Sequence, residues 1–252
     1  MRTRPSYRLR AVVFDVDGTL AETERDGHRR AFNLALRDHG LPYEWSVTEY
    51  GRLLAVPGGR RRLETYLADR GHPDAAELAR AVHETKTKHF LAWLHTGTLM
   101  ARPGVHELLR ELRDQEIAVA VATTGARAWV SVLLERLFRD ITFAAVVTAD
   151  DVTHLKPHPE AYRLAVAALG LGPEEVLSVE DSPPGLDAAV RAGLPCLVVT
   201  SAYHRGARFS GAAAVLPSYL AMDLFDAPVP TYLRGGVTAE ALRRLHAVAR
   251  PR

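Results

Sequence analysis

The stretch FDVDGTLAETE, Phe14–Glu24, decides how the rest of the chain is interpreted. An apolar run, Val12-Val13-Phe14, ends in two aspartates one residue apart, Asp15 and Asp17. Because alternate residues of an extended strand point the same way, both carboxylates can face one cleft. Gly18 then allows a tight turn with no side chain in the way. The stretch therefore predicts a buried strand that delivers two carboxylates to a site.

The composition is that of an ordinary globular protein: 252 residues, 47% hydrophobic and 25% charged. The net charge of +2 does not indicate a general nucleic-acid binder. No apolar run approaches the ~20 residues that a membrane helix needs, and the basic start lacks the apolar stretch of a secretory signal. The single cysteine, Cys196, excludes a disulfide within the chain. We therefore expect a cytoplasmic monomer that binds neither nucleic acid nor membranes.

The second half of the chain alternates between apolar strands and helical segments. Strands are expected at 117–122, 144–148, 176–180 and 196–200, and helices at 105–114, 126–137, 160–169 and 184–192. This alternation predicts a parallel sheet with helices on both faces.

The segment between about 25 and 98 shows helical patterns only. They cover 28–39, 47–55, 60–69 and 75–95, with Gly97 as one of the separators. The fold class is therefore α/β, with a small all-helical domain inserted after the first strand. We place the α/β core at 1–22 and 99–226, the helical insert at 23–98, and a surface strap with a short helix (239–248) at 227–252.

Polar residues cluster at four places toward the carboxyl ends of the predicted strands: Asp15 and Asp17, Thr123 and Thr124, Lys156, and Glu180 with Asp181. The carboxyl ends of parallel strands form the edge at which ligands bind. Carboxylates are hard donors suited to Mg²⁺, while hydroxyl groups near a helix start and a lysine can hold a phosphate.

This set of groups predicts phosphoryl transfer. An aspartate can attack a phosphoryl group and form an aspartyl-phosphate, and a neighbouring carboxylate can move the proton. We assign Asp15 as the nucleophile and Asp17 as the general acid and base. For Glu180, direct ligation of the metal and support of the other ligands remain open alternatives.

The motifs DVDGT, ATT, KPHP and VEDS resemble, in order and spacing, the four motifs of the haloacid-dehalogenase-like (HAD) superfamily. The resemblance implies a Rossmannoid core with a helical cap domain. It also implies that Mg²⁺ binds to Asp15, the Asp17 carbonyl and Asp181. In the same way, Thr123, Thr124 and Lys156 correspond to the phosphate-holding positions.

The stretches AETERDGHRRAFN, EYGRLLAVPGGRRRL, HETKTKHF and GGVTAEALRRLHA are similar to the CbbY branch of this superfamily. That branch contains sugar-bisphosphate phosphatases that act on xylulose 1,5-bisphosphate. The resemblance implies these substrate-binding residues: Glu24, His28, Tyr50, Gly59, Arg60, Arg62 and Lys86. The chain departs from the pattern in having arginine where lysine is common at position 60, and one extra residue near Gly27.

A second phosphate far from the metal would need its own cationic seat, and the run Arg60–Arg62 after two glycines offers one. The alternative for these arginines is a solvated helix face. Trp45, Phe90 and Trp93 are expected in the core. The eleven histidines show no spacing typical of a zinc site.

Three other functions compete with the sugar-bisphosphate phosphatase. A β-phosphoglucomutase-like mutase forms the same aspartyl-phosphate but passes the phosphoryl group to a sugar hydroxyl instead of water. A small-substrate phosphatase of the phosphoglycolate type is the second. A non-catalytic binding protein is the third, although such a copy would be expected to have lost one of Asp15, Asp17, Lys156 or Asp181.

Overall fold

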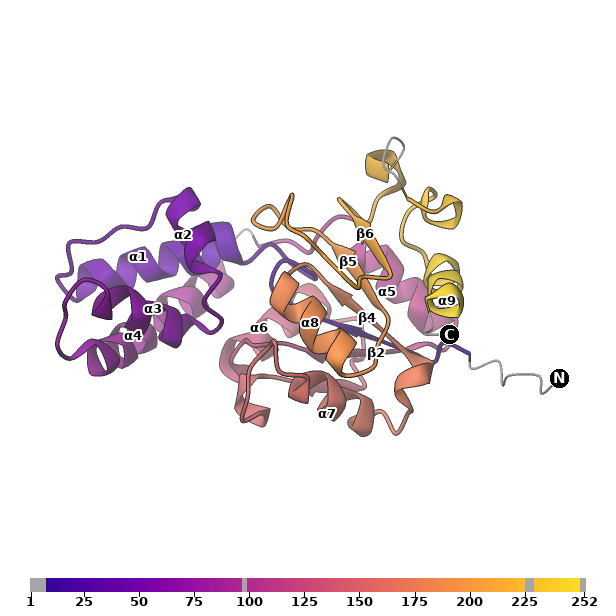
Figure 1. Cartoon of the computed structure of the whole chain (residues 1–252), viewed down its shortest axis with the longest axis horizontal. Coiled ribbons are helices and arrows are strands. Elements are labelled where there is room, and N and C mark those ends of the chain that lie inside the picture. The colour runs from indigo at the N-terminus through magenta and orange to yellow at the C-terminus, as the bar shows by residue number, and fades with distance from the viewer. Residues whose placement is uncertain (1–7, 97–98, 225–228, 250–252) are drawn as a thin grey trace.

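The computed structural model describes residues 8–96, 99–224 and 229–249. It consists of an α/β body and a helical body, which follows the first strand at the carboxyl ends of the strands (Figure 1). Gly97 lies outside the described residues. The expected boundaries at 98/99 and 226/227 also touch residues outside the described ranges, so these boundaries stay predictions, as does the one at 22/23.

Within the described residues, six parallel strands form one sheet in the order β3-β2-β1-β4-β5-β6. Their bounds are β1 Ala11–Phe14, β2 Ala118–Ala122, β3 Ala145–Val147, β4 Val176–Glu180, β5 Cys196–Val199 and β6 Ala214–Leu216. The α/β class with a parallel sheet is therefore confirmed. The three-residue β6 was not expected, since so short a strand leaves no pattern to detect.

The helices have these bounds: α1 Arg29–Asp38, α2 Val47–Leu53, α3 Gly59–Ala68, α4 Ala75–Thr96, α5 Val105–Asp114, α6 Arg127–Leu137, α7 Glu160–Ala168, α8 Pro183–Arg191 and α9 Ala239–Val248. Short helical turns lie at η1 Glu24–His28, η2 Ala149–Asp151, η3 Pro173–Glu175, η4 Ala221–Leu224 and η5 Thr231–Leu233. No helix in the described ranges combines the length and apolar character that crossing a membrane requires.

Strand β1 lies at the centre of the sheet, and its residues alternate between two apolar layers. Val12 and Phe14 pack with residues of α5, α6 and α9, whereas Ala11 and Val13 pack with residues of α7 and α8. Because both faces of the sheet are buried, its strands are continuous apolar runs.

The C-terminal tail differs from the surface strap that the sequence suggested. Leu233, Leu242 and Leu245 are fully buried and belong to the same apolar cluster as Phe14. The backbone N–H of Ala239 also donates to Glu111 Oε2 on α5 at 2.9 Å. The apolar face of α9 therefore completes one layer of the core.

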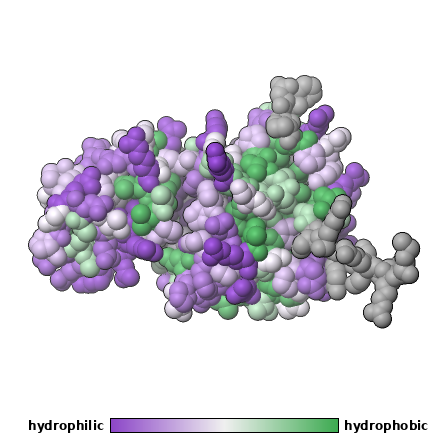
Figure 2. Space-filling model, in the orientation of Figure 1, coloured by the Kyte–Doolittle hydropathy of each residue, from purple (hydrophilic) through white to green (hydrophobic). Residues whose placement is uncertain are grey.

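The helical body has an apolar cluster of its own, formed by α1 to α4. Trp45 is fully buried in this cluster, as expected. Phe90 is also fully buried, but it packs with the partly buried Trp93 in the larger cluster that includes residues of α6. Hydrophilic residues cover most of this body in the view of Figure 2. A domain with its own core and a polar exterior is typical of an independently packed insert.

The chain enters the helical body through the π-helical turn η1. The backbone N–H groups of Gly27 and His28 both donate to Thr23 O, at 3.1 and 2.8 Å. A π-helical turn accommodates one residue more than an α-helical turn, which accounts for the extra residue near Gly27. A Cβ at Gly27 would lie 2.6 Å from Trp93 and 2.7 Å from Phe90, so only glycine fits there without rearrangement.

Candidate active site

One cluster at the carboxyl ends of the strands consists of Asp15, Lys156 and Glu180. Lys156 Nζ lies 2.6 Å from Asp15 Oδ1 and 2.6 Å from Glu180 Oε1, and it donates to the carbonyl of Ala122 at 2.8 Å. Burial lowers the pKa of Lys156, but the two carboxylates outweigh it and the net shift is upward. The ammonium group is therefore held charged beside Asp15.

Glu180 is fully buried, and hydrogen bonds occupy both oxygens of its carboxylate. Oε1 accepts from Lys156 at 2.6 Å and from the hydroxyl of Tyr162 at 2.7 Å. Oε2 accepts from the backbone N–H of Asp181 and from Ser182 Oγ, both at 3.2 Å. Because both oxygens are occupied, this arrangement favours a supporting role for Glu180 over direct ligation, and the group that it supports is Lys156 rather than a metal ligand.

Three buried carboxylates gather at this edge. One oxygen each of Asp15, Glu180 and Asp181 lie within 4.8 Å of one another. Burial raises the pKa of Asp15 and of Asp181, although Lys156 opposes the shift at Asp15. Because the site holds more carboxylates than cations, it fits a hard divalent cation such as Mg²⁺.

Asp17 faces the helical body. Its Oδ1 accepts a hydrogen bond from the hydroxyl of Thr23 and lies 3.1 Å from His28 Nε2. Burial raises the pKa of Asp17, and the hydrogen bond from Thr23 opposes that shift. A raised pKa favours the protonated form that a general acid needs.

His28 connects Asp17 to a lysine of α4. Lys86 Nζ lies 2.8 Å from His28 Nδ1. An ammonium group can only donate, so Nδ1 accepts and the N–H at Nε2 donates to Asp17. Burial and Lys86 lower the pKa of His28 well below its usual value, and burial lowers the pKa of Lys86 to about 8. His28 therefore acts as a neutral donor.

The two threonines after β2 differ in their surroundings. Thr123 is buried, and its Oγ1 accepts from the backbone N–H of Gly125 at 3.0 Å. Thr124 lines the cleft on both the Asp15 side and the Lys86 side. The phosphate-holding roles of both residues stay predictions, and Thr124 is the one at the cleft surface.

On the helical body, Glu24, Tyr50 and Arg62 form one hydrogen-bonded group. The hydroxyl of Tyr50 donates to Glu24 Oε2 at 2.5 Å, and Arg62 Nη1 donates to the same hydroxyl at 3.3 Å. Arg62 Nε also donates to the carbonyl of Leu53 at 3.0 Å. Arg62 is therefore a buried, oriented cation at the cleft wall.

The start of α3 gives this part of the cleft a positive character. Gly58 has a φ of +81°, and no side chain among the described residues caps the helix at this end. Unpaired N–H groups at a helix start attract anions. Arg60 and Arg61 are exposed, unlike Arg62, yet both line the same region as Gly59 and Lys86.

Three further residues hold the site together but were not predicted. Arg102 is buried and donates to the carbonyls of Gly18, Val199 and Thr200, at 2.5, 2.8 and 2.9 Å. The other two, Tyr203 and His204, lie in the loop after β5. A lone arginine, tyrosine or histidine carries no pattern, so nothing in the sequence identified them.

The loop after β5 reaches both halves of the site. His204 Nδ1 lies 3.0 Å from Asp181 Oδ2. The ring of Tyr203 lies 5.8 Å from that of Tyr50 on α2. The loop therefore connects the carboxylate edge of the sheet to the helical body.

Comparison with known proteins gives a consistent result. A model of the family described as haloacid dehalogenase-like hydrolase matches residues 9–193. Protein CbbY of Cereibacter sphaeroides is 39% identical over 216 residues, which cover 84% of this chain and 93% of the relative. A phosphorylated carbohydrates phosphatase of Thermotoga maritima is 32% identical over 187 residues, covering 74% and 82% of the two chains.

A solved structure is also similar. It is that of a substituted CbbY from Rhodobacter sphaeroides in complex with xylulose 1,5-bisphosphate. Its TM-score to this chain is 0.78 at 38% identity, and the match covers 83% of this chain and 94% of that one.

Proposed function

The chain belongs to the haloacid dehalogenase-like hydrolase family as an enzyme of the phosphatase type, and from this premise we propose that it is a Mg²⁺-dependent phosphatase acting on a sugar bisphosphate. Xylulose 1,5-bisphosphate is the substrate we propose, since a CbbY structure similar to this chain contains it. The mechanism we propose proceeds through an aspartyl-phosphate on Asp15.

The observation that carries the proposal is a cleft with two adjoining regions, each lined by groups that could seat an anion, with Arg62 and Thr124 lining both. One lies at Asp15, Thr124 and Lys156, beside the buried carboxylates. The other is formed by the start of α3 with Arg62 and Lys86. A substrate with a phosphate at each end would satisfy both seats, whereas a monophosphate would leave one without a partner.

In the first step, Asp15 attacks the phosphorus atom and the bond from phosphorus to the sugar oxygen breaks. Asp17, whose raised pKa favours the protonated form, gives its proton to the leaving oxygen. Lys156 binds the phosphoryl oxygens while Glu180 holds its ammonium group in place. Mg²⁺ bound to Asp15, Asp181 and the Asp17 carbonyl would offset the negative charge on those oxygens.

In the second step, Asp17 takes a proton from water as the water attacks the aspartyl-phosphate. The bond from phosphorus to Asp15 breaks, and inorganic phosphate leaves. The N–H of His28 supports the carboxylate form of Asp17 during this step. Transfer to a sugar hydroxyl instead of water would make the enzyme a mutase, and product analysis distinguishes the two.

The helical body supplies the selectivity in this proposal. Arg62 and Arg60 bind the distal phosphate together with the N–H of Gly59, and Tyr50 orients Arg62. Glu24 accepts from a sugar hydroxyl, and Lys86 adds charge while it positions His28.

A phosphate-release screen with Mg²⁺ across sugar monophosphates and bisphosphates tests this function. We expect the highest kcat/KM with a pentulose bisphosphate. Arg62→Ala should lower that value by roughly ten- to a hundredfold, because hydrogen bonds from a charged donor contribute about 1.5–3 kcal/mol each. Arg80→Ala removes an exposed arginine of α4 that lines neither part of the cleft, so it is the matched control and should change kcat/KM little.

Monophosphate turnover provides the control for folding. If Arg62→Ala lowers monophosphate and bisphosphate turnover equally, the distal-phosphate assignment is wrong. Asp15→Asn should abolish the hydrolysis of para-nitrophenyl phosphate, and residual Mg²⁺-dependent turnover would contradict the nucleophile assignment. Isomerised sugar without phosphate release would assign a mutase instead.

A further inference from the structure

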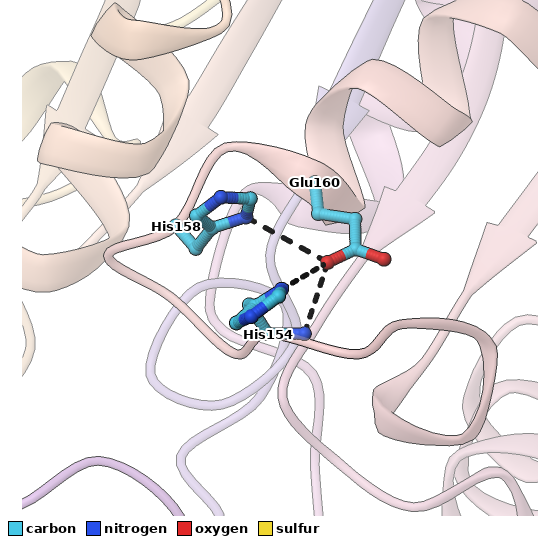
Figure 3. A group of neighbouring side chains, drawn as sticks. All are labelled: His154, His158 and Glu160. Carbon is cyan, nitrogen blue, oxygen red and sulfur yellow. Dashed lines mark hydrogen bonds and ion pairs between the residues drawn. The ribbon is translucent and has the colours of Figure 1, made fainter.

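The loop that carries Lys156 also brings together His154, His158 and Glu160, away from the carboxylate cluster. His154 and His158 stand two residues before and two residues after Lys156, and Glu160 is the first residue of α7. Figure 3 shows both imidazole rings facing one oxygen of Glu160. No zinc-type spacing was recognised among the histidines, so the grouping of these two with Glu160 is a result of the loop conformation.

The distances within the group suit a metal ion. Glu160 Oε2 lies 3.2 Å from His154 Nδ1 and 3.6 Å from His158 Nδ1, and one donor atom of each residue falls within 4.8 Å of the others. Ligand atoms around a tetrahedral ion, at bonds of about 2.0–2.1 Å, are about 3.4 Å apart. The two distances lie on either side of that value.

The carboxylate is fixed in place before any ion binds. Glu160 Oε1 accepts from the backbone N–H of Thr153, and Oε2 accepts from that of His154, both at 2.9 Å. These two hydrogen bonds hold the carboxylate in one orientation. Ligands that are held by hydrogen bonds to the backbone bind metals more tightly than free ones.

A hydrogen bond to Glu160 explains the position of the His154 ring but not that of the His158 ring. At 3.6 Å, the contact from His158 to Glu160 is too long for a hydrogen bond. The side chains of His154, His158 and Glu160 are 63%, 45% and 25% exposed, so an ion can enter directly from solvent.

We propose that His154, His158 and Glu160 form a binding site for a divalent transition-metal ion of the Zn²⁺ class, separate from the Mg²⁺ site. Imidazole nitrogens favour Zn²⁺, Ni²⁺ and Cu²⁺ over Mg²⁺, and a water molecule would complete the coordination. The bound ion closes the segment 154–160 into a ring that contains Lys156, and so restrains the loop that carries it.

Calorimetric titration of the whole protein with Zn²⁺, in a large excess of Mg²⁺, tests the proposal. The Mg²⁺ keeps the carboxylate cluster filled. We expect one Zn²⁺ bound by the wild type, with an affinity reduced at least about tenfold in His154→Ala and in His158→Ala. The matched control is His95→Ala, an exposed histidine near the end of α4, which should bind as the wild type does.

Thermal unfolding gives a second measurement that does not depend on activity. Zn²⁺ should raise the melting temperature of the wild type and of His95→Ala, but not that of the double variant His154→Ala/His158→Ala. Unchanged Zn²⁺ stoichiometry and affinity in both single variants would overturn the proposal, since the ion would then be bound elsewhere.

Discussion

Replacing Glu180 by glutamine tests whether this residue supports Lys156 or ligates the metal. All four groups that contact its carboxylate are donors: Lys156, Tyr162, Ser182 and the N–H of Asp181. The new amide NH₂ would therefore face donors in either orientation. Removing one partner of a buried ion pair costs about 3–5 kcal/mol. At about 2–4 °C per kcal/mol for a chain of this size, the melting temperature should fall by roughly 6–20 °C.

The assay is thermal unfolding, with urea unfolding for the free energy, of the wild type and of Glu180→Gln, each with EDTA and with saturating Mg²⁺. If Glu180 supports Lys156, the loss appears already in EDTA, and Mg²⁺ stabilises both proteins by the same amount. The control Glu84→Gln removes an exposed partner of Arg80 and should leave the free energy of unfolding nearly unchanged.

The opposite pattern would refute this reasoning. If Glu180 were a direct ligand, its replacement would relieve repulsion between the carboxylates in EDTA. The variant would also lose the stabilisation that Mg²⁺ gives to the wild type. A Glu180→Gln variant that is as stable as the wild type in EDTA and gains nothing from Mg²⁺ would assign Glu180 to the metal.

Three further changes test the segment through which the chain enters the helical body and the contacts of the buried Arg102. Thr23→Val removes a hydrogen bond that opposes the upward pKa shift of Asp17, so the alkaline limb of the pH profile of kcat/KM should move to higher pH; an unmoved limb would count against Asp17 as the acid. Gly27→Ala should lower the free energy of unfolding by about 1–3 kcal/mol in urea, because its Cβ would overlap two aromatic rings; wild-type stability would contradict the tight packing of the π-helical turn. Arg102→Met leaves three carbonyls without their donor and should cost at least about 3 kcal/mol, whereas the exposed Arg110→Met should cost little; equal losses would contradict the bridging role.

The sequence predicted the elements with strong local patterns most accurately. The bounds expected for α5 and β4 match to the residue, because α5 has a regular apolar period and β4 is a short, largely apolar run. The strand ends also met as expected, since parallel strands place their carboxyl ends at one edge. Asp15 and Glu180 are far from Lys156 in the chain, yet a carboxylate oxygen of each lies 2.6 Å from the ammonium group of Lys156.

What the sequence could not predict depends on contacts between distant segments. Arg102 and His204 gain their roles from carbonyls and a carboxylate in distant segments of the chain, which no local period reveals. The extra residue near Gly27 was visible because this segment of the chain is one residue longer than the pattern of the family. Its π-helical form, however, depends on the space that Phe90 and Trp93 leave. Likewise, α9 was predicted as a helix, but only the packing against α5 shows that it belongs to the core.

The central position of β1 has a consequence for the order in which the chain folds during synthesis. The ribosome makes β1 before the other strands of this sheet, and its neighbours β2 and β4 follow only after the whole helical body has been made. The helical body has its own apolar cluster, so it can pack while β1 still lacks both partners. We expect the nascent chain to carry a folded helical body beside an exposed apolar strand, with Asp15 and Lys156 coming into contact only late in translation.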